Sequence, residues 1–272
     1  MSAAELLIGT QGWHYPEWVG PFYPAGTAPQ HMLELYARAF RSVEVDATFY
    51  AVPADKTVDG WRERVSSAFR FAAKVPQQIT HELRLVDVQD PLELFVDRMR
   101  RLGDRLGACL VQLSPDFAPT PLNRQALAVF LDLLPGDARW AVEFRDARWF
   151  EPTVLGTLRA RNVALALAEG RWVGRDVLLD LAREPTADFA YVRWMGPDRR
   201  ITDFSRVRVD RDEDLGVWAD ALEGLALRVR TVFGYFNNHW QGHSPASARG
   251  LQRLLGQEPV DPAALRTQRE FF

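Results

Sequence analysis

Short apolar or aromatic runs alternate with helical patterns along the chain, and each apolar run ends on polar or charged residues. Eight such runs, which we expect to be β-strands, span residues 6–10, 43–47, 69–75, 108–113, 140–145, 163–168, 189–194 and 231–236. Apolar residues at helical spacing predict helices at residues 30–40, 55–65, 90–106, 123–134, 152–161, 212–225 and 245–255. This alternation of strand and helix predicts parallel βαβ units.

The pattern predicts an α/β fold, a single (β/α)8 TIM-type barrel with parallel strands that spans residues 1–272 as one domain. No linker rich in glycine, serine or proline divides the chain. A doubly wound open sheet is the competing architecture, but it commonly has a glycine-rich first turn, and residues 9–12 lack that fingerprint. Active sites of barrels lie at the carboxyl ends of the strands, so the polar run ends form the candidate site.

Two helix starts carry capping signals. Asp90, Pro91 and Glu93 are typical of an N-cap, a first-turn proline and a capping-box acid. Ser244 and Pro245 predict an N-cap and a first-turn proline for the last helix. In barrels this last helix start often binds phosphate, because free backbone N–H groups and the helix dipole face the pocket.

Period-two alternation predicts which polar side chains point into the barrel. Charged side chains do not suit the helix layer, so we expect them to face the interior and its mouth. The inward set comprises the acids Glu44, Asp46, Glu143 and Glu169, the cations Arg70, Lys74, Arg145 and Arg193, and the amide Gln112. Arg70 lies early in its strand, so we expect it to be a deep ion-pair partner. The set forms either a structural ion-pair network or a polar pocket with acid–base groups, and its clustering at strand ends favours the pocket.

Lys74 differs from the other inward cations. Of the 33 basic residues only Lys56 and Lys74 are lysines, and Lys74 lies at a strand end. A lysine there suits proton transfer or pairing with an anion, because its pKa shifts readily. Chance placement is the alternative.

The segment 235–245 is the densest polar cluster of the chain. It holds Asn237, Asn238, His239, His243 and Ser244. The two histidines are four residues apart, but the glycine and proline around them argue against one helix that carries both. No glutamate follows the first histidine, so a zincin motif is absent. Hydrogen bonding or substrate orientation is the favoured role, no cofactor is required, and a divalent metal stays open.

Aromatic residues gather after the same strand ends, where each can pack a loop or stack on a sugar or base. Trp13 follows the first predicted strand and Tyr50 the second. The segment 195–210 carries Arg199, Arg200, Arg206 and Arg208. It is either a mobile cationic lid or a solvated loop.

Composition narrows the class of protein. The formal charge is −3, which neither requires nor forbids a polyanionic partner. The single cysteine, Cys109, lies in an apolar run, so we expect a buried small hydrophobe and neither a disulfide nor a cysteine-based metal site. The chain opens on a strand without a targeting segment, and no stretch approaches a membrane span. A cytoplasmic location without membrane contact follows by default.

The motifs together resemble the YecE-like family, whose members carry a domain of unknown function. They are IGTQGW (8–13), YPEW (15–18), FYP (22–24), VEVDATFY (43–50), FRFAAK (69–74), QL (112–113), EFR (143–145), WF (149–150) and YFNN (235–238). The resemblance implies a TIM-type barrel and supplies no established reaction. Asp146 stands where many relatives have a histidine, and Met195 where the family pattern has another. A histidine-rich metal site is therefore less expected here.

The first functional hypothesis is an enzyme that acts on a small anionic substrate, phosphorylated or nucleotide-like. The catalytic candidates are Glu44, Asp46, Lys74 and Glu143, with a glutamate as general base and the lysine as electrophile or acid. The substrate-binding candidates are Trp13, Tyr50, Gln112, Arg145, Arg193, Asn237, Asn238, His239, His243 and Ser244.

Two alternatives stay open. A glycoside-processing enzyme would use Glu44 and Glu143 as paired carboxylates, and a structure with both tied to arginines deep in the barrel would exclude it. A non-catalytic protein that binds nucleotides or nucleic acid would use the aromatic rim and the arginine-rich loop, with affinity that falls steeply with salt.

Overall fold

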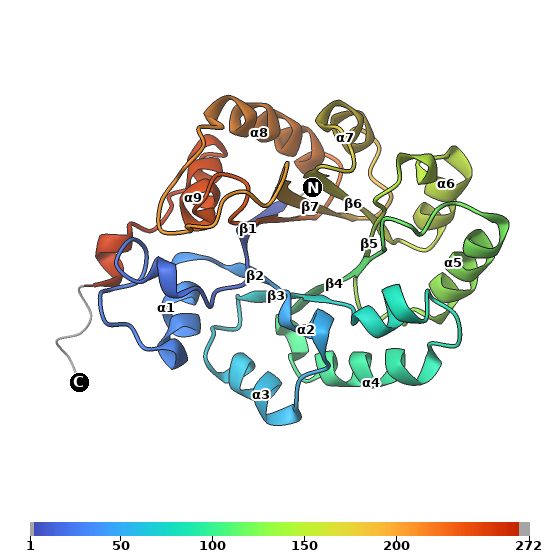
Figure 1. Cartoon of the computed structure of the whole chain (residues 1–272), viewed down its shortest axis with the longest axis horizontal. Helices are drawn as coiled ribbons and strands as arrows, with labels where there is room; N and C mark the ends of the chain where they lie inside the picture. Colours follow the sequence, from blue (N-terminus) through green and yellow to red (C-terminus); the bar gives the residue numbers. More distant parts are fainter. Residues whose placement is uncertain (1–2, 267–272) are drawn as a thin grey trace.

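The strands of the computed structural model, which describes residues 3–266, form one closed parallel barrel in chain order (Figure 1). They are β1 (Glu5–Gln11), β2 (Ser42–Val45), β3 (Arg70–Lys74), β4 (Leu106–Gln112), β5 (Trp140–Glu143), β6 (Ala164–Gly170), β7 (Phe189–Gly196) and β8 (Thr231–Phe236). The register of β1 against β8, from Glu5 opposite Thr231 to Thr10 opposite Phe236, closes the ring. The predicted (β/α)8 barrel is confirmed, and every predicted strand is present.

Helices surround the barrel on its outside (Figure 1). They are α1 (Met32–Ala39), α2 (Ala47–Tyr50), α3 (Asp55–Glu63), α4 (Gln89–Arg100), α5 (Pro121–Leu133), α6 (Pro152–Ala160), α7 (Arg175–Ala182), α8 (Asp212–Ala226) and α9 (Ser244–Leu254). All the predicted helices are present. The four-residue α2 and the eight-residue α7 were not predicted. The pattern of α7 is weak because its buried stripe consists of Leu178 and Ala182 alone. Within residues 3–266 no helix is long and apolar enough to cross a bilayer.

The predicted bounds of α4 were wrong at both ends. Val88 occupies the N-cap, and Asp90 lies inside the first turn without a capping hydrogen bond. The helix stops at Arg100 instead of continuing to residue 106, because Gly103 adopts a φ of 56° and begins a short 3-10 turn before β4. The early stop leaves residues 101–105 as a connection to β4, with Gly103 inside it and Gly107 at the second position of the strand.

The core has two layers, one between the strands and the helices and one inside the barrel. The lower interior is filled unevenly. β3 to β6 contribute the small side chains Ala72, Ala108, Ala141, Ala164 and Ala166, whereas β7 and β8 contribute Phe189, Tyr191, Phe233 and Tyr235. Large rings from one half of the barrel therefore fill the space that alanines leave in the other half, as close packing requires. Polar side chains occupy the layer above them, toward the mouth.

Cys109 lies on the outer face of β4 and is buried, as predicted. Burial raises the pKa of its thiol to about 12, so the reactive thiolate is not populated at neutral pH. This cysteine acts as a small apolar side chain.

Candidate functional site

Arg193 of β7 is the centre of the buried polar layer. Its guanidinium donates from Nε and Nη2 to the two carboxylate oxygens of Glu44 on β2, at 2.9 and 2.7 Å. Its Nη1 donates to Glu143 of β5 at 2.5 Å and to Gln112 of β4 at 3.3 Å. Period-two alternation placed all four side chains in the interior, and the structure brings them together there.

The pKa values of the two carboxylates in this layer are shifted in opposite directions. Burial raises the pKa of Glu44 and outweighs the attraction of Arg193, and the hydroxyl of Tyr191 donates to Glu44 at 2.7 Å. Burial also raises the pKa of Glu143, but Arg193 and Arg145 together outweigh it and lower the pKa. Both glutamates are thus tied to arginines deep in the barrel. This is the arrangement that excludes the paired-carboxylate glycosidase, and it favours a structural role for Glu44.

Lys74 and Asp46 form a second pair at the edge of this layer. The lysine Nζ lies 3.7 Å from Asp46 Oδ1 and 3.9 Å from the centre of the Phe49 ring. Burial lowers the pKa of Lys74 and outweighs the attraction of the aspartate. Asp46 Oδ1 accepts no hydrogen bond within residues 3–266, although Arg193 Nη2 lies 3.9 Å away. This pair therefore keeps unused hydrogen-bonding capacity, in contrast to the arginine-bound glutamates.

A pocket of about 400 Å³ opens at the carboxyl ends of β5 to β8. We call it the mouth pocket. The arginines Arg145, Arg171 and Arg199 line it, together with Trp172 and His239. The guanidinium of Arg171 lies 4.3 Å from the ring centre of Trp172, and 42% of Trp172 is exposed. The pocket thus combines cations with an exposed aromatic face.

Arg193 connects the mouth pocket to the Lys74–Asp46 pair, because it lies 3.9 Å from Asp46 and donates at 2.5 Å to Glu143, which lines the pocket. His81 lies in a short π-helical turn (Gln78–Glu82), and its ring centre lies 5.1 Å from that of Phe49, against which Lys74 packs. Burial lowers the pKa of His81, and repulsion from Arg145 of the pocket and Lys74 of the pair adds to the effect. Glu143 lines the pocket floor and receives a hydrogen bond from Arg145 Nε at 3.0 Å.

Asn237 and His239 are placed in the mouth pocket, as their position after β8 suggested. Asn237 Nδ2 donates to Gln11 Oε1 at 2.8 Å, and its own Oδ1 accepts from the backbone N–H of His239 at 2.9 Å. Burial lowers the pKa of His239, and Arg199 lowers it further. A neutral imidazole on a cationic wall suits hydrogen bonding to a ligand.

Asn238, His243 and Ser244 fasten the loop after β8 instead of lining the mouth pocket. Asn238 Oδ1 accepts from the backbone N–H and the hydroxyl of Ser244, at 3.0 and 2.9 Å, and from Trp18 Nε1 at 3.3 Å. His243 Nδ1 lies 2.8 Å from the carbonyl oxygen of Phe204. Ser244 was expected to be the N-cap of α9, but it is the first helical residue and is fully buried. Asn238 accepts the hydrogen bond of the Ser244 backbone N–H, and the start of α9, where phosphate binding was predicted, is covered.

Trp13 and Tyr50 also lie away from the mouth pocket. Trp13 packs edge-on against Trp61 and Phe71, with ring centres 5.8 and 6.4 Å apart. Tyr50 ends α2 with 73% of its surface exposed. Of the two roles considered for these aromatic residues, Trp13 has the packing role, and it does not line the mouth pocket although it was a substrate-binding candidate.

The comparisons with known proteins agree with this architecture. A model of the family described as "Protein of unknown function DUF72" matches residues 7–270. The chain belongs to the DUF72 family. The protein YecE (UPF0759) of Escherichia coli K12 is 35% identical over 171 residues, which cover 61% of this chain and 60% of the length of YecE.

Two further relatives extend over nearly the whole chain. The protein YunF (UPF0759) of Bacillus subtilis is 26% identical and the match covers 93% of this chain and 95% of YunF. The crystal structure of a DUF72 family protein from Thermotoga maritima is 24% identical, with a TM-score of 0.79, and covers 93% of this chain and 100% of that one. The family names carry no reaction, and this structural likeness supports the fold alone.

Two members of the predicted inward set do not face the barrel interior near the mouth. Glu169 points outward and accepts a hydrogen bond from the indole N–H of Trp218 on α8. A charge can face the helix layer here because this indole supplies a donor. Arg70 lies at the opposite end of the barrel and donates to the carbonyl oxygens of Ser67 and Phe69, at 2.8 and 3.0 Å. The expectation that Arg70 is a deep ion-pair partner was wrong.

Three residues of the site were not predicted from the sequence: Arg171, Trp172 and Gln11. The first two follow β6 directly, so the rule that strand ends carry the site would have found them if the strand had been extended to Gly170. Gln11 ends β1, and its Nε2 lies 2.9 Å from the sulfur of Met195. Within residues 3–266 no group of three or more His, Cys, Asp or Glu side chains is placed to hold a metal ion.

The arginine-rich segment 195–210 is partly anchored. Arg208 forms an ion pair with Asp203, and its backbone N–H donates to the carbonyl oxygen of Gln241 at 2.6 Å. Arg200 pairs with Asp198 at 3.1 Å. Arg199 alone of the four arginines lines the mouth pocket. The segment thus contributes one cation to the pocket.

Proposed function

We propose that the protein is an enzyme that binds a small anionic substrate, phosphorylated or nucleotide-like, in the mouth pocket. One observation carries this proposal. Three arginines line the pocket, and its two acids, Glu143 and Asp198, are already paired with arginines. Within residues 3–266, Arg171 and Arg199 have no carboxylate partner. The pocket wall therefore carries uncompensated positive charge at the end of the barrel where active sites lie.

The chemistry of these side chains fits a phosphate group. Guanidinium groups donate paired hydrogen bonds to phosphate oxygens and stay charged at all physiological pH values. The exposed face of Trp172 can stack on a base or a sugar, as aromatic rings at binding sites do. A phosphate bound near Arg145 and Arg171 would place the rest of the substrate on this ring.

The Lys74–Asp46 pair is the best acid–base candidate. Because its pKa is lowered, Lys74 releases its proton more readily than an exposed lysine does. Asp46 keeps an oxygen without a hydrogen bond, and 34% of its side chain is exposed. Glu44 and Glu143 are engaged by Arg193, so we assign the base role to Asp46 and a positioning role to the glutamates.

A non-catalytic nucleotide-binding protein is the second candidate. The stacked Arg171–Trp172 pair favours it, because such a pair recognises a base and a phosphate without any reaction. The two candidates share the pocket and differ in whether Lys74 and Asp46 are used.

Binding and turnover of nucleoside monophosphates and sugar phosphates by the full chain test the proposal. Arg145→Gln and Arg171→Gln should each weaken binding about tenfold, since each removes charged hydrogen bonds. Lys74→Met should abolish turnover and leave binding unchanged. Lys56→Met and Arg183→Gln remove the same charges from exposed positions and should change neither.

The outcomes separate the candidates. Unchanged affinity in both arginine variants would overturn the mouth pocket as the binding site. Turnover that survives in Lys74→Met would remove the proposed acid. Binding that depends on both arginines and falls steeply with salt, without product from any compound, would favour the second candidate.

A further inference from the structure

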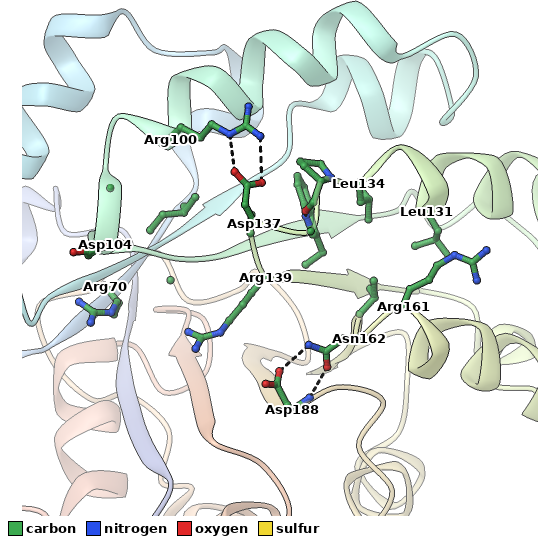
Figure 2. Close-up of a pocket in the computed structure, with 18 of the residues that line it drawn as sticks. Arg70, Arg100, Asp104, Leu131, Leu134, Asp137, Arg139, Arg161, Asn162 and Asp188 are labelled. Atoms are coloured by element: carbon green, nitrogen blue, oxygen red, sulfur yellow. Dashed lines mark hydrogen bonds and ion pairs between the residues drawn. The ribbon is translucent and has the colours of Figure 1, made fainter.

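A second hollow, of about 1050 Å³, lies at the opposite end of the barrel, beneath the starts of β3 to β7 (Figure 2). We call it the basal hollow. It is lined from segments 67–70, 100–107, 131–140 and 161–163 and by Asp188. These segments precede strands, so the hollow is separate from the mouth pocket. In barrels of this kind the amino end is ordinarily a face that serves stability.

Small residues create the basal hollow. Gly103, Gly107, Gly136 and Ala138 all line it, and an added Cβ at Gly103 or Gly136 would meet nothing within 4 Å. At Gly107 a Cβ would lie 2.9 Å from the Phe233 ring and 3.2 Å from Arg70 Cβ. Glycine at this position therefore keeps room for the Arg70 side chain beside the aromatic floor of the barrel.

Most acidic side chains around the basal hollow already have a hydrogen-bond partner, and Figure 2 shows Asp137 with Arg100 and Asp188 with Asn162. The partnerships are Asp137 with Arg100 at 3.0 and 3.2 Å, Asp132 with Arg161 at 2.8 and 2.6 Å, and Asp188 with Asn162 at 2.9 Å. These groups need no ligand to complete their hydrogen bonding, and they define the rim.

Two arginines of the basal hollow differ from the rim. Arg70 uses Nη1 on backbone carbonyl oxygens, and Arg139 has its guanidinium 6.0 Å from the ring centres of Phe189 and Phe233. Neither has a carboxylate partner within residues 3–266. Figure 2 shows both side chains extending into the same part of the hollow. Asp104 is the one lining carboxylate in this range without a hydrogen bond or ion pair.

We propose that the basal hollow binds a phosphate-bearing anion between Arg139 and Arg70. The Arg139 guanidinium lies 6.0 Å from two aromatic ring centres, and cation–π attraction to them favours its position at the floor of the hollow. Phosphate oxygens accept the paired N–H groups that a guanidinium offers. Two unpaired cations face one unpaired acid, so the site favours a multiply charged group. This site is independent of the function proposed for the mouth pocket.

Calorimetric titration of the full chain with inorganic pyrophosphate at low ionic strength tests this site. An Arg145→Gln/Arg171→Gln background suppresses binding at the mouth pocket. In that background Arg139→Gln and Arg70→Gln should each weaken binding about tenfold, since each removes charged hydrogen bonds. Asp104→Asn should strengthen it, because the opposing charge is removed. Arg38→Gln, exposed on α1, removes the same charge elsewhere and should have no effect.

The expected changes in affinity are opposite: a loss in the two arginine variants and a gain in Asp104→Asn. If these residues had a merely structural role, Asp104→Asn would not increase the affinity. Circular dichroism and melting temperature verify that each variant is folded. Unchanged affinity in Arg139→Gln, or an equal loss in Arg38→Gln, would overturn the site. A repeat with adenosine diphosphate separates the sources of the anion. Equal affinity indicates recognition of the phosphates alone, and higher affinity indicates a nucleotide.

Discussion

Arg193 shows how a charge is kept inside this barrel. Its guanidinium is 1% exposed and contacts both glutamates of the interior layer. An unpaired charge at such a depth would cost several kcal/mol, and removal of one partner from a buried ion pair typically costs about 3–5 kcal/mol. The contacts of this one side chain therefore fix β2, β5 and β7 relative to one another.

The pH dependence of stability should report on Glu143. Its pKa in the folded protein lies below the ordinary value of 4.5, so its contribution to stability is complete above that value and is lost as the pH falls through the folded pKa. We expect the free energy of unfolding to decrease on acidification below about pH 4.5, and to decrease less in Glu143→Gln. Urea denaturation at a series of pH values measures this.

Two glutamates serve as comparisons for that measurement. For Glu44 the effect of pH on stability has the opposite sign. Its pKa is raised in the folded protein, so its contribution to stability is lost as the pH rises through the folded pKa. Glu63→Gln changes an exposed acid and should keep the acid-side slope of the unaltered protein. Equal slopes in Glu143→Gln and the unaltered protein would show that Glu143 is not stabilised by its arginines.

At the scale of elements, the strands could be predicted better than the helix ends. Each strand is a short apolar run bounded by polar residues, whereas α4 ends through a backbone conformation at Gly103 that periodicity does not reveal. The inward-facing polar residues followed from alternation because charge is costly in the helix layer. Glu169 broke that rule because its partner, Trp218, comes from a helix 49 positions away in the chain.

Two glycines in different elements give opposite predictions for substitution by alanine. A Cβ at Gly9 of β1 would overlap the carbonyl oxygen of Ser42, which also accepts from Tyr36. Gly9→Ala should therefore lower the free energy of unfolding by about 1–3 kcal/mol. Gly156 lies in the middle of α6 with nothing within 4 Å of the added atom, so Gly156→Ala should raise it by about 0.5–1 kcal/mol.

Chemical denaturation of both variants measures the difference, and each serves as the control of the other. A loss in Gly156→Ala similar to that in Gly9→Ala would mean that the close approach of β1 to Ser42 does not set the cost.

At the scale of the whole molecule, the barrel has two ends with different chemistry. The mouth could be predicted because its residues follow strands and because active sites of this fold lie there. The basal hollow could not be predicted in this way, since it results from glycines and from residues such as Arg139 that precede strands. Exposure at the rim and burial of Ser244 also depend on how loops pack, which no local pattern encodes.

Closure of the ring makes the last strand essential to all the others. A chain that ends at Leu227 would lack β8 and α9, and would leave β1 and β7 with unpaired edges. Open edges of this kind pair with other chains. We expect this truncated chain to aggregate, as measured by size-exclusion chromatography with light scattering alongside the full chain. A monodisperse monomer with native circular dichroism would contradict the dependence on closure.

The interior arginine also bears on how fast the barrel forms and opens. Arg193 is separated from Glu44 by 149 positions and from Glu143 by 50, so these groups meet only when long stretches of chain are already assembled. Long loops must close before such contacts contribute, so we expect these contacts to form late in folding. Contacts that form after the transition state slow unfolding and leave the folding rate unaffected. We therefore expect the buried charge network to set the lifetime of the folded barrel more than the speed of its formation.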